Sequence, residues 1–191
     1  TTIHLGRVRA EQGQLHDAVH LDRDALALAD RHGWGRLPMV GLPHVWLAKA
    51  LYEWNDLAGA AQHAQAGMEP LHFSTHQRIP LEAYAIMARI RLAQGDLTGA
   101  QELMARAVEV AQAAAMKWAA PRVAAYQARA WLAQGELERA QQWLHTARLR
   151  LDDELTSQRE YEQITLARVL IALNRVDQAL PFLARLAEAA E

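Results

Sequence analysis

Five basic side chains recur along the chain at an almost constant spacing. Successive members are 42, 40, 40 and 39 residues apart, and the members are Arg7, Lys49, Arg89, Arg129 and Arg168. Cationic groups in a row on one surface would attract an anionic ligand or an acidic peptide, since guanidinium pairs bidentately with carboxylate or phosphate. The same cations could instead pair with carboxylates of neighbouring segments, or lay their methylene groups over an adjacent helix. The sequence leaves both interpretations open.

Each of these basic residues lies eight positions before the Leu or Val of a short turn block. Every block has a helix-breaking Gly or Asn, then Leu or Val two residues later, then Ala three residues after that. The blocks are Gly13/Leu15/Ala18, Asn55/Leu57/Ala60, Gly95/Leu97/Ala100, Gly135/Leu137/Ala140 and Asn174/Val176/Ala179. Self-similarity at a period of about 40 residues indicates one supersecondary unit repeated as a solenoid.

Two helices fill each repeat. Residues 81–94 carry apolar side chains at helical spacing until Gly95, and a second apolar stripe runs from Leu97 to Val110. Small residues stand nine positions before each key Leu or Val, where two helix backbones must approach closely. These residues are Gly6, Ala48, Ala88, Ala128 and Ala167. The sequence therefore predicts an all-α fold built from helical hairpins.

Composition limits the function classes. The chain has 191 residues, a formal net charge of -2 and no Cys, so it offers no basic footprint for nucleic acid, no disulfide and no thiolate metal site. No run approaches eighteen consecutive apolar residues, so we expect no membrane contact and a cytoplasmic protein. The repeat runs end to end, which predicts a single domain over 1–191. Because the chain enters the pattern at Thr1 in mid-repeat, we expect a piece of a longer repeat array in a larger protein.

The hairpin pattern resembles the tetratricopeptide repeat. In that family a small residue stands seven positions before a Gly-Asp/Asn-Leu/Tyr turn, and Ala follows three positions after the turn. Ala88 with the turn 95–97 and Ala100 matches this pattern, and so does Ala128 with the turn 135–137 and Ala140. The usual period of about 34 residues is shorter than the 39 to 42 found here. The resemblance implies a right-handed superhelix of about five tetratricopeptide-like helical hairpins.

A narrower resemblance covers essentially the whole chain. Residues 51–57 (LYEWNDL), 92–97 (LAQGDL) and 166–173 (LARVLIAL) are similar to the superhelical domain of MalT-type, LuxR-family ATP-dependent transcriptional activators. In that family the superhelix lies between a nucleotide-binding module and a helix-turn-helix module, and it receives an inducer or a regulatory partner. The chain has no G-x-x-x-x-G-K-S/T phosphate loop, so the resemblance implies that ATP and DNA are bound elsewhere in the parent protein.

The resemblance places the basic series on the concave surface, because the position after the small residue faces that side in such hairpins. Aromatic side chains on the first helices could join it, with Glu53 as a polar neighbour. They are Trp46, Tyr52, Tyr126 and Trp131. These rings would stack on a sugar or a planar metabolite beside the cations. The alternative is that they form ordinary core between repeats.

Histidine and carboxylate patterns give no metal or catalytic site. His16 and His20 have the i, i+4 spacing of a metal pair. At the equivalent positions, however, the other repeats carry mostly residues of a solvated helix face. His72 and His76 lie in a loop without an obvious third ligand. No acid–base or nucleophile constellation is found, so we expect no cofactor, no metal and no enzyme activity.

The leading functional hypothesis is an effector- or partner-binding segment of a MalT-like transcription regulator. A small-molecule inducer, or a protein or peptide partner, would bind the concave groove and bias the flanking modules. An alternative is an adaptor that binds a peptide or protein partner without sensing small molecules. A third interpretation is a structural spacer whose cations are consumed by internal ion pairs. A homo-oligomer remains open.

Overall fold

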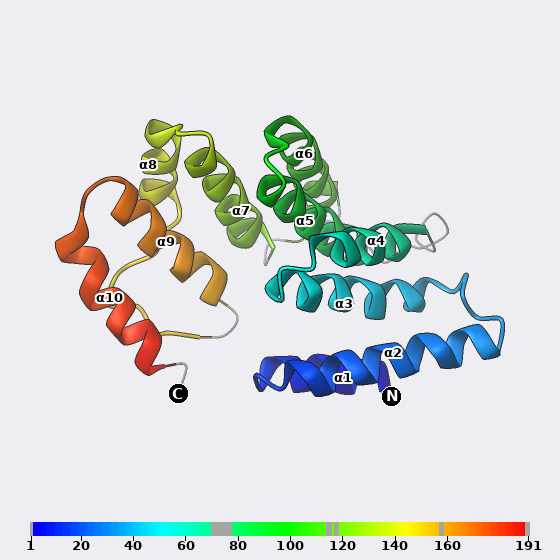
Figure 1. Cartoon of the computed structure of the whole chain (residues 1–191). Helices are drawn as coiled ribbons and strands as arrows, with labels where there is room; N and C mark the ends of the chain where they lie inside the picture. The colour runs from blue at the N-terminus through cyan, green and yellow to red at the C-terminus, as the bar shows by residue number, and fades with distance from the viewer. Residues whose placement is uncertain (1, 70–77, 114–115, 117–118, 157–158, 190–191) are drawn as a thin grey trace. The chain divides into compact units, whose positions relative to one another are not determined.

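The computed structural model describes residues 2–69, 78–113, 116, 119–156 and 159–189. Within these residues every extended regular element is a helix (Figure 1). The α-helices are α1 (Thr2–Glu11), α2 (Leu15–Arg31), α3 (Gly41–Glu53), α4 (Leu57–Met68), α5 (Arg78–Ala93), α6 (Leu97–Ala113), α7 (Ala120–Ala133), α8 (Leu137–Thr146), α9 (Glu160–Ala172) and α10 (Val176–Glu188). A short 3-10 turn, Pro38–Val40, precedes α3.

Consecutive helices pair into five hairpins, which fall into two compact units. Unit 1, Thr1–Ala115, holds the hairpins α1/α2, α3/α4 and α5/α6, and unit 2, Met116–Glu191, holds α7/α8 and α9/α10. In unit 1 the first helices α1, α3 and α5 pack in series, and α2 and α4 each contact the first helix of the next hairpin. In unit 2, α9 packs on both α7 and α8. The predicted all-α fold of tetratricopeptide-like hairpins is confirmed, and the single domain over 1–191 stays a prediction.

The five predicted turn residues all adopt the left-handed backbone conformation that ends a helix. Their φ angles are 76° at Gly13, 61° at Asn55, 80° at Gly95, 75° at Gly135 and 58° at Asn174. Only Gly, and to a lesser degree Asn, enters this region at low cost. The next residue then donates its N–H to the carbonyl five positions back, as Asp96 does to Arg91 at 2.9 Å, and this closes a Schellman motif.

The second helix of each hairpin begins at the key Leu or Val. Two of these starts carry an aspartate cap: the Oδ1 atoms of Asp56 and Asp96 accept the backbone N–H of Gly59 and Gly99, each at 2.9 Å. The cap satisfies a donor that the first helical turn leaves without a partner. The turn and the cap together fix the point at which each hairpin reverses.

The predicted small residues lie at the centre of the hairpins. Gly6 is buried, Ala48, Ala88 and Ala128 are completely buried, and Ala167 is nearly so. The block alanines are buried as well. At Gly67, an added Cβ would lie 3.0 Å from Val45 Cγ2 and 3.1 Å from the carbonyl oxygen of Gly41. The close approach of α3 and α4 therefore depends on the absence of side-chain bulk.

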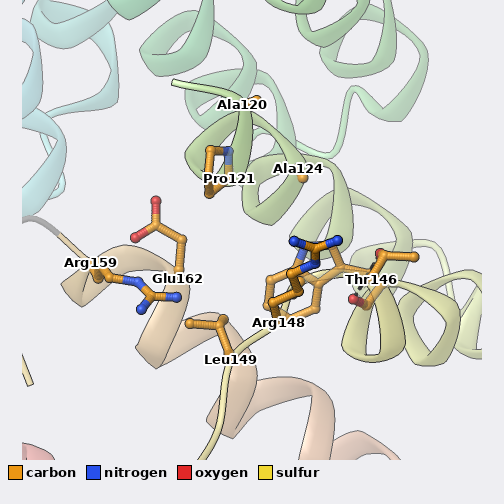
Figure 2. A pocket seen from close by; sticks show the side chains of 10 residues that line it. Ala120, Pro121, Ala124, Thr146, Arg148, Leu149, Arg159 and Glu162 are labelled. Carbon is orange, nitrogen blue, oxygen red and sulfur yellow. Dashed lines mark hydrogen bonds between the residues drawn. The ribbon is translucent and has the colours of Figure 1, made fainter. Parts of the chain in front are cut away.

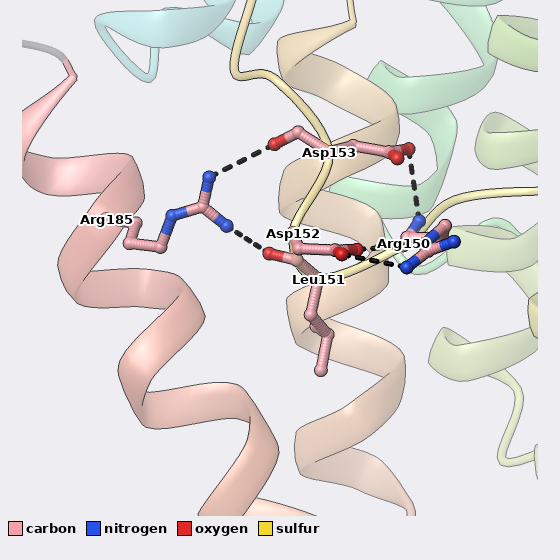
Figure 3. A network of polar contacts seen from close by, with 5 residues as sticks. All are labelled: Arg150, Leu151, Asp152, Asp153 and Arg185. Carbon is pink, nitrogen blue, oxygen red and sulfur yellow. Dashed lines mark hydrogen bonds and ion pairs between the residues drawn. The ribbon is translucent and has the colours of Figure 1, made fainter.

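The described part of the connector between α8 and α9, residues 147–156, belongs to unit 2 and contacts α10. Figure 3 shows Arg185 of α10 donating to the carbonyl oxygens of Leu151 and Asp153. Arg150 donates to both carboxylate oxygens of Asp152, at 2.9 and 2.8 Å. The two hydrogen bonds of Arg185 hold the connector against α10, whereas the Arg150–Asp152 bonds lie within the connector. In the part of the chain that the structure describes, none of the helices combines the length and apolar character that a membrane crossing needs.

Candidate functional site

Three of the predicted site residues meet in unit 1. Arg89 on α5 donates from Nη2 to Glu53 Oε1 at 2.8 Å, and its guanidinium carbon lies 4.2 Å from the ring centroid of Tyr52. Tyr52 and Glu53 end α3, so this contact joins the second hairpin to the third. Tyr52 also packs against a core that includes Leu51 and Ile86. A cation held over a ring beside a carboxylate forms a compact polar cluster, here called the Arg89 cluster (Tyr52, Glu53 and Arg89).

The other predicted residues of unit 1 lie on the same series of first helices. Lys49 on α3 pairs with Glu82 on α5, again a contact between neighbouring hairpins. Arg7 on α1 and Trp46 on α3 are each half-buried. Two members of the basic series in unit 1 therefore meet carboxylates of an adjacent hairpin, which is the arrangement that the structural interpretation of the series anticipated.

In unit 2 the predicted residues meet rings. Arg129 lies over Tyr161 with 5.1 Å between the guanidinium carbon and the ring centroid, and the rings of Tyr126 and Tyr161 are 4.3 Å apart. Tyr126 is buried, whereas Trp131 is half-buried against the core and Arg139 lies 5.9 Å from its ring. Arg168 is exposed on α9. The rings of Tyr126 and Tyr161 thus form a contact between α7 and α9.

A pocket that the sequence did not predict lies wholly within unit 2 (Figure 2). It encloses about 390 Å³ between α7, the end of α8, the connector and the start of α9. Its walls are largely apolar, with polar groups from four side chains and a fifth at Trp143. The lining residues are Ala120, Pro121, Ala124, Trp143, Thr146, Ala147, Arg148, Leu149, Arg159 and Glu162.

Glu162 is the unusual residue of this pocket. It is 4% exposed, and its Oε2 atom has no hydrogen-bond partner among the described residues. Its Oε1 atom lies 3.6 Å from Nε of Arg122. The sequence did hold a signal, because the equivalent position, fourteen residues before the key Leu or Val, is apolar in the three preceding repeats. Those residues are Pro43, Ala83 and Val123.

A second buried carboxyl group lies in unit 1. Asp22 on α2 is 2% exposed, and its Oδ1 atom has no hydrogen-bond partner within the described segments. Burial raises the pKa of Asp22 to about 7. Repeats two to five carry Ala64, Met104, Leu144 and Leu183 at this position. Asp22 is thus another polar side chain in an otherwise apolar column, and it packs against Gly6 of α1.

A histidine pair connects α3 and α4. The Nδ1 atoms of His44 and His63 lie 2.9 Å apart, so one ring donates to the other. Burial lowers the pKa of both imidazoles; the nearby ring of His63 lowers that of His44 further, and Arg23 lowers that of His63. The described residues contain no group of three or more His, Cys, Asp or Glu side chains arranged to hold a metal ion.

Two of the four histidines considered as metal ligands in the sequence lie in the described part of the chain. His16 and His20 are exposed on α2, and His16 stacks on Trp54 with 4.8 Å between ring centroids. His72 and His76 lie outside the described residues.

Comparisons with known proteins identify the family. The chain matches the model of the MalT-like TPR region over residues 1–191. Two structures of a putative kinesin light chain with nearly identical TPR-like repeats from Podosopora anserina are 21% identical, with TM-scores of 0.64 and 0.63; both cover 98% of this chain and 92% of theirs. BtubC (BKLC) from P. vanneervenii is 18% identical, with a TM-score of 0.63 over 96% of this chain and 76% of its own. A search of curated proteins finds no match. At these identities the solved structures support the helical-repeat fold alone. Because the family model spans the whole sequence, the chain belongs to the MalT-like TPR region family.

Proposed function

We propose that the chain is the effector- or partner-binding region of a MalT-like, LuxR-family transcriptional regulator in the cytoplasm. The family match over the whole chain supports this role. In the proposed regulator, a nucleotide-binding module and a DNA-binding module flank the repeats. A ligand that prefers one arrangement of the hairpins biases those modules by its differential affinity. The repeats themselves carry out no catalysis and contact no nucleic acid.

The Arg89 cluster is the observation that carries the proposal of a binding surface. The Arg89 side chain is 15% exposed and is held over Tyr52, whereas the Glu53 side chain is 53% exposed. An incoming carboxylate or phosphate can displace the half-exposed Glu53 side chain while the guanidinium stays in place. The first helices that carry Arg7, Trp46, Lys49 and Arg89 pack in series, so a longer ligand can reach several of these side chains.

Calorimetric titration of the 191-residue chain tests this binding surface. The probes are sugars, phosphorylated metabolites and acidic peptides, each measured against the wild type and against Arg89→Glu. We expect at least one anionic probe to bind, and the charge reversal to abolish its heat signal while the chain remains folded. Arg91→Glu is the matched control, because Arg91 lies on the same helix with a 52% exposed side chain, outside the cluster.

Three outcomes would contradict or redirect the proposal. No heat from any probe would count against a ligand groove. If Arg89→Glu lowers the thermal stability while no ligand binds, Arg89 serves only in an internal ion pair, and the structural-spacer interpretation is favoured. Capture of one protein at constant stoichiometry, unaffected by small molecules, would replace effector sensing by the adaptor function. The flanking modules are tested by reading the complete open reading frame of the parent protein.

A further inference from the structure

The pocket of unit 2 contains a buried hydrogen-bond acceptor without a donor. Glu162 Oε2 is shielded from solvent and has no partner in the described structure. A buried polar atom without a hydrogen bond costs folding free energy, and a carboxylate costs more than a neutral group. Since three other repeats have an apolar residue at this position, the packing of the hairpins does not require a carboxylate here. The other oxygen, Oε1, lies 3.6 Å from Nε of Arg122, so Oε2 is the atom that still lacks the hydrogen bond which a cationic ligand in the pocket could supply.

The same pocket contains a buried donor without an acceptor. Trp143 is 4% exposed, and its indole Nε1 has no hydrogen-bond partner within the described part of the chain. Indole N–H can only donate, so it needs an acceptor such as a carboxylate oxygen. Glu162 is on α9 and Trp143 is on α8, so the two residues line the pocket from different helices.

A guanidinium group adds a positive charge to this pocket. Arg148 is exposed and forms no ion pair or side-chain hydrogen bond with the rest of the described chain, whereas Arg159 pairs with Asp153 at 3.5 Å. Arg148 also has a φ of 51°, a conformation that costs free energy in residues other than Gly and Asn. In Figure 2, Arg148 and Glu162 lie on opposite sides of the pocket. Glu162 already has one cationic neighbour, Arg122, at its Oε1 atom, so Arg148 supplies a further positive charge on the other side of the pocket.

We propose that this pocket binds a small zwitterion of the α-amino acid class. The ligand ammonium donates to Glu162 Oε2, and the ligand carboxylate accepts from the indole Nε1 of Trp143 and pairs with Arg148. The ligand side chain lies on the apolar wall that includes Pro121 and Leu149. The enclosed volume suits a ligand of this size, being near the lower end of the range for small-molecule sites. The proposal deepens the effector-binding function proposed above, and it rests on that function for the ligand's role.

The connector supports this site by fixing one of its walls. Arg148 and Leu149 belong to the connector segment, which Arg185 ties to α10 through the carbonyl oxygens of Leu151 and Asp153 (Figure 3). Gln163 adds a hydrogen bond from Nε2 to the carbonyl oxygen of Glu154 at 2.9 Å. The pocket is therefore lined by a segment that several hydrogen bonds hold in place.

The test is a titration of the 191-residue chain followed by ¹H–¹⁵N NMR of the tryptophan indoles. The chain has six Trp residues, and the Trp143→Phe variant assigns the Nε1–H signal of Trp143 by its disappearance. The probes are the individual L-amino acids, each with its N-acetyl form, which lacks the ammonium, and its α-amide, which lacks the carboxylate. We expect at least one amino acid to shift the Trp143 signal in a saturable way. Its two singly charged forms should bind about tenfold more weakly or worse.

Glu162→Gln is the decisive variant, and Glu160→Gln is its matched control. Both residues lie on α9, but Glu160 is exposed and does not line the pocket. We expect Glu162→Gln to weaken amino acid binding about tenfold or more, because the charge-assisted hydrogen bond is lost, and Glu160→Gln to leave it unchanged. If Glu162→Gln fails to fold, the N-acetyl and α-amide probes on the wild-type chain make the same distinction.

Other results overturn the proposal. Absence of any saturable shift at the Trp143 indole across the amino acid panel would show that the pocket takes no amino acid. Equal binding of an amino acid and its N-acetyl form would show that Glu162 does not recognise the ammonium group. Binding of a neutral sugar, with no amino acid bound, would show that the pocket takes a polyol instead. Each of these results leaves the Arg89 cluster to be judged by its own titration, so the two proposals can fail separately.

Discussion

Arg89 Nη2 donates to Glu53 Oε1 at 2.8 Å, and this hydrogen bond joins the third hairpin to the second. The two partners differ in their surroundings, since the Arg89 side chain is largely buried and the Glu53 side chain is half exposed. The contact is therefore at once a link in the stack of hairpins and a group that an external anion can reach.

Replacement of Arg89 by alanine should destabilise unit 1 moderately. We expect Arg89→Ala to lower the free energy of unfolding by about 1 to 2 kcal/mol, because it removes both an ion pair and a cation–π contact with Tyr52. Glu53→Gln should cost less than about 1 kcal/mol, since the Arg89–Tyr52 contact remains. Urea denaturation of the 191-residue chain measures both values. Arg91→Ala is the control, and an equal loss there would contradict the role given to the Arg89 cluster.

Asp22 should make the stability of the chain depend on pH. Burial raises its pKa from 3.8 to about 7. Between these two pH values the folded chain therefore holds a proton on Asp22 that the unfolded chain has lost. The contribution of Asp22 to stability is full below pH 3.8 and is lost as the pH rises through about 7.

The variant Asp22→Asn tests this. It should raise the free energy of unfolding at pH 8 by about 1 to 3 kcal/mol and change it little at pH 4, because the amide carries no charge to bury. Thermal unfolding at both pH values gives the measurement. Asp24→Asn, an exposed position on the same helix, should show no such difference. A destabilised Asp22→Asn at pH 8 would contradict the assignment.

The histidine pair should act in the opposite direction with pH. The pKa of His44 and that of His63 are both lowered from 6.5, chiefly by burial. Their contribution to stability is present above pH 6.5 and is lost as the pH falls below that value, because the unfolded imidazoles then bind protons more readily.

The loss of stability between pH 7 and pH 5 should therefore be smaller in His63→Gln than in the wild type. His20→Gln, at an exposed position on α2, should retain the wild-type dependence. Urea denaturation at the two pH values separates these cases. An unchanged pH dependence in His63→Gln would show that the pair does not couple protonation to folding.

Gly95 should be required by its backbone conformation alone. Its φ is 80°, and an added Cβ would meet nothing within 4 Å, so no steric neighbour contributes. We expect Gly95→Ala to lower the free energy of unfolding by about 1 to 2 kcal/mol. Gly35→Ala is the control, because its Cβ would meet only Asp30 Oδ1 at 3.8 Å and its φ is not positive. Equal stability of Gly95→Ala and the wild type in chemical denaturation would contradict this reading of the turns.

The hairpins could be predicted from the sequence because their determinants are local or periodic. A helix end with a left-handed backbone conformation favours Gly or Asn, whatever the tertiary surroundings. Residues such as Asn55 and Asn174 therefore predicted the turns correctly. The small residues at Ala48 and Ala88 repeat with the hairpins, and both are completely buried as expected. Backbone geometry and the repeat period sufficed for this part of the fold.

Side-chain partners depended on the packing of one hairpin against the next. Lys49 meets Glu82 and Arg89 meets Glu53 across 33 and 36 residues, and neither pairing follows from the repeat period. The pocket of unit 2 is bounded by parts of α7, α8, the connector and α9, so no single motif encodes it. The amino-acid sequence determined where the first helix of each hairpin ends and the second begins, because the backbone conformation of a turn is a local property. Only the tertiary structure decided which charges pair, as Glu162 does with Arg122, and which polar atoms, like Oε2 of Glu162, are buried without a hydrogen bond among the described residues, because that depends on how side chains from separate helices meet in space.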